Sequence, residues 1–308
     1  MDIFLHHYPA SLFSEKIRLL LGHLGLSWNS VIIPSIMPRP LLMPLSGGYR
    51  KTPVLQIGAN VYCDTKIIAR GLARHTGNQS LYAPGFGAHR VADWADANLF
   101  PVTVALNFSP AAVAAMMGSF PPEEAAAFQK DRAQLTEGGS ITRFSAEAAA
   151  AYLRHYLAEL DESLADPGAP YLFGTTPCVA DFALYHCLWF VRNNPVNAPL
   201  VERHASVMAW MSRMAANGHG SAREASGEMA LAAARAAQPV LPELDNLVPE
   251  GFALGQTVQV TPVDYGRIPV TGTLVGWSAE EIVLARETPE TGAVMTHFPS
   301  PGFEVQPA

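Results

Sequence analysis

The residues best suited to chemistry lie near the start of the chain, between a predicted strand and a predicted helix. They form the segment Ser11-Leu12-Phe13-Ser14-Glu15-Lys16. The N-terminus of a helix presents unpaired backbone N–H groups and a positive dipole end, which together stabilise an anion such as a thiolate. Ser11 would present its hydroxyl at that point. On spacing alone, the ordinary alternative is that Ser11 or Ser14 only caps the helix.

A second segment offers backbone groups to a peptide-like ligand. In Lys51-Thr52-Pro53-Val54-Leu55 a proline directly precedes a predicted strand. If the Thr52–Pro53 bond is cis, the backbone beside it turns outward and can pair with an extended ligand as an added strand would.

A third segment, Tyr62-Cys63-Asp64-Thr65-Lys66, lies at the start of another predicted helix. Thr65 can cap this helix and hold a ligand carboxylate on its N–H groups. Asp64 can receive an ammonium group. Together the three segments form an ordered set.

The elements that must position these segments alternate between strand and helix from Asp2 to about Thr76, which indicates an α/β unit. The apolar spacing predicts a helix that ends at Gly25, where a left-handed C-cap would lie. The turn Gly58-Ala59-Asn60 predicts a hairpin. The predicted order is a strand at 3–7, a helix through 17–24, a strand at 31–33, paired strands at 54–57 and 61–63, and a closing helix through 68–75.

The rest of the chain divides into a helical region and a region of strands. Residues 77–88, rich in Gly, Asn and Pro, read as a linker, and a long helical region follows. Within it, residues 180–191 leave almost no polar face, which places that helix at the centre of a bundle. After Pro242 the pattern predicts a small all-β module with strands at 257–261, 270–275, 282–285 and 294–298.

Composition excludes several classes of protein. A length of 308 residues indicates about two domains with a smaller third. The net charge of −7, with two basic against seven acidic residues from Glu250 onward, disfavours nucleic acid as a partner. Three cysteines, an odd number, argue against a disulfide framework. We see no signal peptide and no apolar run of membrane-spanning length, so we predict a soluble cytoplasmic protein.

The three segments, in this order, resemble the N-terminal thioredoxin-like domain of the glutathione transferase superfamily. The helical region resembles its C-terminal domain, where residues 174–182 (GTTPCVADF) are similar to the family's capping segment. This resemblance extends from Met1 to about Ala237 and does not cover the β module. It implies a glutathione-binding domain at 1–77 and an all-helical domain at 88–238, followed by a small β-barrel-like module at 249–308.

The resemblance also implies roles for individual residues. Ser11 matches the residue that addresses the glutathione sulfur in serine- and cysteine-type members. His7 stands where tyrosine-type members carry their tyrosine, so the tyrosine mechanism is not expected. Pro53 matches the family's cis-proline, after which Val54 would give its backbone N–H and C=O to the cysteinyl part of glutathione. Thr52 is also expected to contact glutathione. Asp64 and Thr65 would bind its γ-glutamyl end, and Arg39 and Lys51 would bind its glycine carboxylate.

The activity implied is that of a glutathione transferase, with glutathione as co-substrate and no metal. The Ser11 hydroxyl would favour the thiolate, which then attacks a small hydrophobic electrophile. Candidate walls for the electrophile pocket are Trp94, Asn98 and Phe100. A homodimer is expected, and neither a membrane nor nucleic acid is expected as a partner.

Two alternatives stay open. One is a non-catalytic binding or scaffolding protein that keeps this fold, with the β module as its interaction surface, since one fold hosts many functions. The other is a glutathione-dependent isomerase or dehalogenase. Thiol-disulfide exchange is not expected, because Ser11 and Ser14 stand where a redox pair of cysteines would be required.

Overall fold

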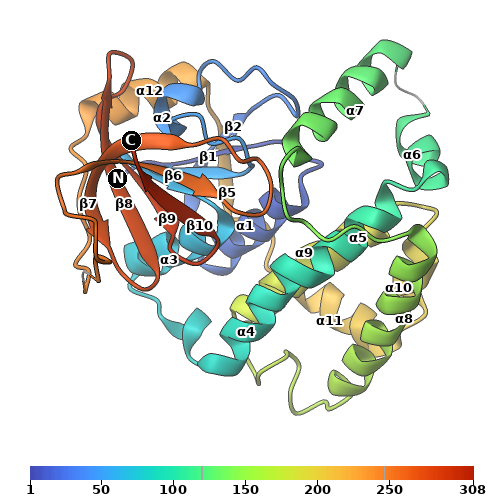
Figure 1. Ribbon diagram of the computed structural model, residues 1–308. Helices are drawn as coiled ribbons and strands as arrows, with labels where there is room; N and C mark the ends of the chain where they lie inside the picture. Colours follow the sequence, from blue (N-terminus) through green and yellow to red (C-terminus); the bar gives the residue numbers. More distant parts are fainter. Residues whose placement is uncertain (119–120, 246) are drawn as a thin grey trace.

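The computed structural model describes residues 1–118, 121–245 and 247–308, and it begins with a thioredoxin-like domain (Figure 1). Strand β1 pairs in parallel with β2 and antiparallel with β3, and β3 and β4 form the predicted hairpin. Gly25 has the left-handed φ of 63° expected after the first helix. The elements are β1 (Ile3–His7), α1 (Leu12–His23), β2 (Ser27–Ile32), α2 (Met43–Ser46), β3 (Val54–Ile57), β4 (Asn60–Cys63) and α3 (Thr65–Thr76).

The helical domain follows a connection that contains a short 3-10 helix at Ser80–Tyr82. Helix α9 is buried almost all round, as its apolar sequence predicts, and it packs against α1, α4 and α5. Helix α7 projects from the bundle toward the strands (Figure 1). The elements are α4 (Phe86–Trp94), a π-helical turn (Ala95–Leu99), α5 (Phe100–Asn107), α6 (Pro110–Met117), α7 (Pro122–Thr136), α8 (Ala146–Ser163), α9 (Val179–Arg192), α10 (Ala198–Glu202) and α11 (Ala205–Ala215).

The C-terminal strands extend the sheet of the thioredoxin-like domain. Strand β9 pairs in parallel with β4, which gives a ten-stranded sheet in the order β10-β6-β7-β8-β9-β4-β3-β1-β2-β5. Strands β5 and β10, which form the two ends of this order, carry no pattern from which a strand was predicted. The elements are β5 (Ser221–Glu224), α12 (Gly227–Ala236), β6 (Thr257–Pro262), β7 (Val270–Trp277), β8 (Glu281–Thr288), β9 (Gly292–Pro299) and β10 (Phe303–Pro307).

The two faces of the N-terminal sheet belong to different cores. Leu5 and Leu55 pack into a core shared with the helical domain. Their chain neighbours Phe4 and Val54 point to the other face, because side chains alternate along a strand. There they share a core with C-terminal residues such as Phe298. The thioredoxin-like domain is therefore packed between the helices and the C-terminal strands.

A buried polar cluster also joins α3 and β4 to the C-terminal strands. Glu281, 1% exposed in its side chain, pairs with Arg74 and lies 2.7 Å from His297 Nδ1. The amide of Asn60 lies 2.8 Å from His297 Nε2. These contacts define a neutral imidazole whose Nδ1–H donates to Glu281 and whose Nε2 accepts from Asn60. Burial lowers the pKa of His297, in agreement with that neutral form.

No single helix among the described residues is long and apolar enough to cross a membrane. One bent pair, Phe86–Asn107 with Pro110–Met116, passes a test of length and composition alone.

Candidate functional site

Ser11 caps helix α1 and also faces a cavity. Its hydroxyl accepts a hydrogen bond from the Ser14 N–H at 3.2 Å, so the capping interpretation is confirmed. The same side chain lines an apolar cavity beside Leu12 and Phe13. Because the cap uses the oxygen only as an acceptor, the hydroxyl proton of Ser11 stays available to a ligand.

The segment around Pro53 forms part of the same region. The Thr52–Pro53 bond is cis, as the family resemblance implied. Thr52 and Pro53 both line a polar cavity. Val54 is fully buried in β3, where its register partners are His6 and Cys63, and it is not among the described residues that line either cavity.

Arg39 holds the loop that carries this segment. It is 3% exposed and donates to the carbonyls of Pro34, Ser35 and Arg50 and to the Thr52 hydroxyl, at 2.9–3.1 Å. Four of its five N–H donors are therefore used within the chain. The side chain lines the apolar cavity.

Asp64 and Thr65 lie together at the start of α3. Asp64 has a positive φ of 104°, and its carboxylate accepts from the Lys66 N–H at 2.9 Å. The Thr65 hydroxyl accepts from Lys16 Nζ at 3.2 Å. Burial raises the pKa of Asp64, although the positive charge of Lys51 opposes this shift. Both residues line the polar cavity.

Asp96 is a candidate that the sequence analysis missed. It lies on the π-helical turn and lines the polar cavity. Its Oδ2 is 2.6 Å from Lys16 Nζ, and its buried Oδ1 has no hydrogen-bond partner among the described residues. Burial raises the pKa of Asp96. The only advance indication was an acidic residue inside a helix that is otherwise largely apolar.

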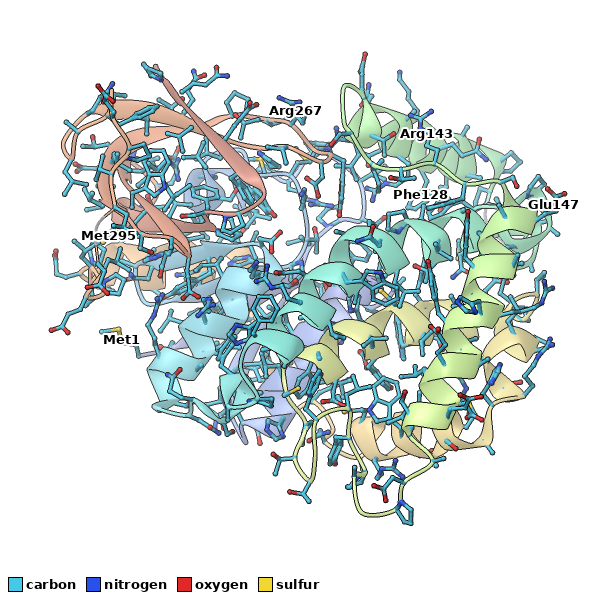
Figure 2. The ribbon with its side chains drawn as sticks, turned by 60° about the horizontal axis from the view of Figure 1, so that its bottom comes forward. Met1, Phe128, Arg143, Glu147, Arg267 and Met295 are labelled. Carbon is cyan, nitrogen blue, oxygen red and sulfur yellow. The ribbon has the colours of Figure 1, made fainter. Side chains whose placement is uncertain are left out.

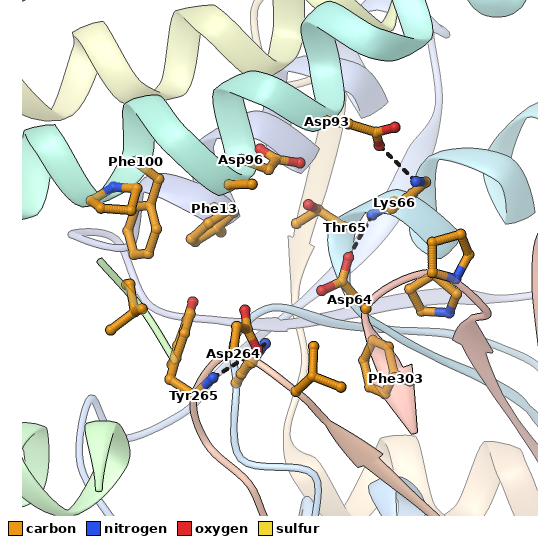
Figure 3. Close-up of a pocket in the computed structure, with 18 of the residues that line it drawn as sticks. Phe13, Asp64, Thr65, Lys66, Asp93, Asp96, Phe100, Asp264, Tyr265 and Phe303 are labelled. Carbon is orange, nitrogen blue, oxygen red and sulfur yellow. Dashed lines mark hydrogen bonds and ion pairs between the residues drawn. The ribbon is translucent and has the colours of Figure 1, made fainter. Parts of the chain in front are cut away.

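Two cavities share part of their lining, and Figure 3 shows the polar one. The polar cavity has a volume of about 480 Å³ and the apolar cavity about 730 Å³. The polar cavity carries Asp64, Thr65 and Asp96, whereas the apolar cavity carries Ser11 and Arg39. Both are lined by Phe13, Lys51, Thr52, Phe100, Ile141 and Tyr265.

Helices α5 and α7 form the apolar wall. Phe108 and Phe128 stack with their ring centroids 6.3 Å apart, and Figure 2 shows Phe128 beside α5. Of the three wall candidates, Phe100 lines both cavities. The other two were wrong: Trp94 packs against Tyr156, and Asn98 is exposed.

The C-terminal strands supply part of the site, which the sequence did not reveal. The Lys51 ammonium lies 2.5 Å from the Asp264 carboxylate and 4.3 Å from the ring centroid of Tyr265. Asp264, Tyr265 and Phe303 all line the polar cavity. Lys51, predicted to take a ligand carboxylate, is therefore already paired.

Of two neighbouring residues at the end of β1, one is buried in the domain and the next lines a cavity. His7 is buried, with Nε2 2.8 Å from the Ser30 hydroxyl and Nδ1 3.1 Å from the Arg18 guanidinium. Tyr8, the next residue, lines the apolar cavity with Ser11. Its position directly after a strand was the only sign of this role in the sequence.

No group of three or more His, Cys, Asp or Glu side chains among the described residues is placed to hold a metal ion.

Comparison with known proteins defines the family. The sequence model for the glutathione S-transferase N-terminal domain matches residues 5–80, and that for the C-terminal domain matches residues 143–213. A GST-like protein from Pseudomonas syringae, solved by crystallography, is 38% identical with a TM-score of 0.82, and the match covers 99% of this chain and 100% of that one. The chain belongs to the glutathione S-transferase family. Because this match includes residues 249–308, the C-terminal strands are common to both proteins.

More distant structures share the fold alone. A glutathione S-transferase from Rhodospirillum rubrum F11 is 16% identical, has a TM-score of 0.51, and matches 69% of this chain and 87% of its own. The Tau class glutathione S-transferase of mango, Mangifera indica, is also 16% identical, with a TM-score of 0.50 and coverage of 70% and 89%. No curated protein sequence matches the chain.

Proposed function

We propose that the chain is an active glutathione transferase that binds glutathione in the polar cavity and a small hydrophobic electrophile in the apolar cavity. The observation that carries this proposal is the junction of the two cavities beside Ser11 and Thr52. A polar cavity suits a charged tripeptide, and an adjoining apolar cavity suits a carbon electrophile.

The polar cavity would orient glutathione through residues of α3 and the π-helical turn. Asp64, with the Asp96 carboxylate adding negative charge beside it, would receive the γ-glutamyl ammonium. The N–H groups at the start of α3, with Thr65, would hold the γ-glutamyl carboxylate. Thr52 and Pro53 would face the cysteinyl backbone, and Arg39 and Lys51 would lie toward the glycine end.

Ser11 would then act on the sulfur. Its hydroxyl donates to the thiolate at the N-terminus of α1, where the helix dipole also favours the anion. The thiol proton leaves to solvent, and the sulfur lone pair forms a bond to the electrophilic carbon. In a substitution the leaving group departs with its bonding electrons; in an addition the π electrons of the electrophile move to the neighbouring atom, which takes a proton from solvent. A free thiol with a pKa of about 8.5 is mostly protonated at neutral pH. Most of the rate enhancement therefore comes from a larger thiolate population that is held in position.

The experiment is calorimetric binding of glutathione together with the thiolate absorbance of the bound sulfur. We expect binding and a thiolate signal in the native protein, and a weaker signal in Ser11→Ala. Ser226→Ala is the matched control, because Ser226 caps α12 through the Met229 N–H at 3.3 Å in the same way. Absence of binding at millimolar glutathione would contradict the proposal.

Two outcomes would favour the alternatives. Glutathione binding with no thiolate signal and no turnover favours a non-catalytic binding protein. Turnover that leaves the glutathione concentration unchanged favours an isomerase, or a dehalogenase where halide is released in the same reaction.

We further propose a cytoplasmic homodimer. The three cysteines are buried and unpaired, which suits a reducing compartment. The charged share of 15% is below the usual share of about 25%, which suits a chain with a subunit contact. Light scattering should give twice the mass of the chain, and the mass of a single chain would contradict the dimer.

A further inference from the structure

The loop between β6 and β7 carries Tyr265 to the boundary of the two cavities. Tyr265 lines both of them. Its ring centroid lies 5.9 Å from that of Phe100, which in turn lies 4.9 Å from that of Phe13. Figure 3 shows the Tyr265 hydroxyl pointing toward Phe13 and Phe100. Ser11, Phe13 and Tyr265 all line the apolar cavity, so the phenol and the serine hydroxyl face the same space.

Backbone hydrogen bonds hold this loop against the helical domain. The Ser140 N–H donates to the Asp264 carbonyl at 2.7 Å. The Gly266 N–H donates to the Leu135 carbonyl, also at 2.7 Å. Tyr265 lies between these two anchored residues, and a group fixed in this way needs little reorganisation to meet a ligand.

Lys51 holds the same loop from the other side. Its ammonium lies over the Tyr265 ring, 4.3 Å from the ring centroid, and pairs with the Asp264 carboxylate at 2.5 Å. The Asp264 carboxylate also accepts the Tyr265 N–H at 2.7 Å. Both the backbone and the ring of Tyr265 are therefore positioned within the chain.

The Tyr265 hydroxyl, in contrast, has no hydrogen-bond partner within the described parts of the chain. Tyr265 is half-buried, so its hydroxyl is open to the cavities that the side chain lines. Burial, followed by the charges of Asp264 and Asp64 and by Tyr8, raises the pKa of Tyr265 well above its usual value. The hydroxyl thus keeps its proton at neutral pH and can donate it to a ligand in the cavity.

We propose that the Tyr265 hydroxyl is a second hydrogen-bond donor to the glutathione thiolate, so that the C-terminal strands contribute a catalytic group to the site. This inference rests on the proposed function, since it requires glutathione in the polar cavity. The thiol proton goes to solvent, and the charge stays on sulfur. Ser11 and Tyr265 both donate to that charge and both keep their protons.

The test is the pKa of the bound thiol, measured by the thiolate absorbance across pH, which needs no electrophile. In Tyr265→Phe we expect that pKa to rise by about one unit, or tenfold less thiolate at a given pH, with the glutathione Kd at low pH within about twofold of native. Tyr152→Phe is the matched control, because Tyr152 lies on α8 with 46% exposure. It should leave the thiol pKa unchanged.

Fluorotyrosine at position 265 provides a second variant that keeps both ring and hydroxyl. As a stronger donor it should lower the thiol pKa. An unchanged thiol pKa in Tyr265→Phe, or a rise with fluorotyrosine, would overturn the inference while Ser11→Ala could still support the proposed function. If native protein binds no glutathione, the proposed function fails and this inference fails with it.

Discussion

The Lys51 ammonium and the Asp264 carboxylate lie 2.5 Å apart and join the thioredoxin-like domain to the C-terminal strands at the wall of the polar cavity. Lys51 is 10% exposed in its side chain and Asp264 is 45% exposed. The Lys51 ammonium, which was predicted to bind a ligand carboxylate, is therefore already paired with a carboxylate of the chain. The C-terminal strands thus influence both the shape and the charge of the cavity.

Asp264→Asn should strengthen glutathione binding. Without the Asp264 charge, the Lys51 ammonium can pair with an anionic ligand, and we expect the Kd to fall by about threefold to tenfold at low salt. Glu304→Gln is the control, because Glu304 pairs with Arg267 and neither lines the cavities. Weaker binding by Asp264→Asn in calorimetry would mean that Asp264 itself holds the ligand.

Asp64→Asn should weaken glutathione binding without loss of the helix cap. Asparagine can still accept the Lys66 N–H, but it lacks the charge that would attract the γ-glutamyl ammonium. We expect a Kd about tenfold higher, since a hydrogen bond to a charged group contributes about 1.5 kcal/mol or more. Asp166→Asn, at a turn where Asp166 accepts the Gly168 N–H, is the control. Equal affinity in native protein and Asp64→Asn would remove Asp64 from the site.

The free energy of unfolding should fall between pH 6.5 and pH 5. Burial lowers the pKa of His6 and of His7 from 6.5 to about 4. As the pH falls below 6.5 the unfolded chain takes up these protons and the folded chain does not. Stability is therefore complete above pH 6.5 and declines toward pH 4, by about 2 kcal/mol for each histidine at pH 5.

Urea unfolding at pH 7 and pH 5 measures this decline. Below pH 5 buried carboxyl groups also contribute. Burial raises the pKa of Asp64 and Asp96, so their protonation in the folded chain increases the free energy of unfolding as the pH falls. The exposed residue His155 provides the control variant, His155→Gln, which should keep the native pH dependence. Equal stability at the two pH values would contradict the neutral buried state of these histidines.

Glu281→Gln should destabilise the junction between α3 and the C-terminal strands. The substitution leaves Arg74 without its carboxylate and weakens the acceptor for His297 Nδ1. Because Arg74 is 34% exposed, we expect a loss of about 2 kcal/mol, below that of a fully buried pair. Glu280→Gln, which removes the exposed pair with Arg70, should cost less than about 1 kcal/mol. Urea unfolding that shows equal losses would contradict the structural role of Glu281.

The sequence by itself determined the elements whose residues are close in the chain. Strand β1 has its predicted bounds, and the hairpin of β3 and β4 follows its turn signal. The burial of α9 on nearly all sides follows from its apolar composition. The start of α3 at this segment was predictable for the same reason, because periodicity is a local property. The predicted cap was wrong by one residue: Asp64 is the N-cap, and Thr65 is the first residue of the helix.

Only the tertiary structure decided how distant segments meet. The pairing of β9 with β4 joins Met295 to Asn60, and neither strand carries a pattern that selects the other. It also decided that Asp264 and Tyr265, on a loop more than 200 residues from Lys51, line the cavities. Apolar strands specify which face is buried, but their partners depend on packing summed over the whole chain. Long-range pairing therefore placed the C-terminal strands at the site.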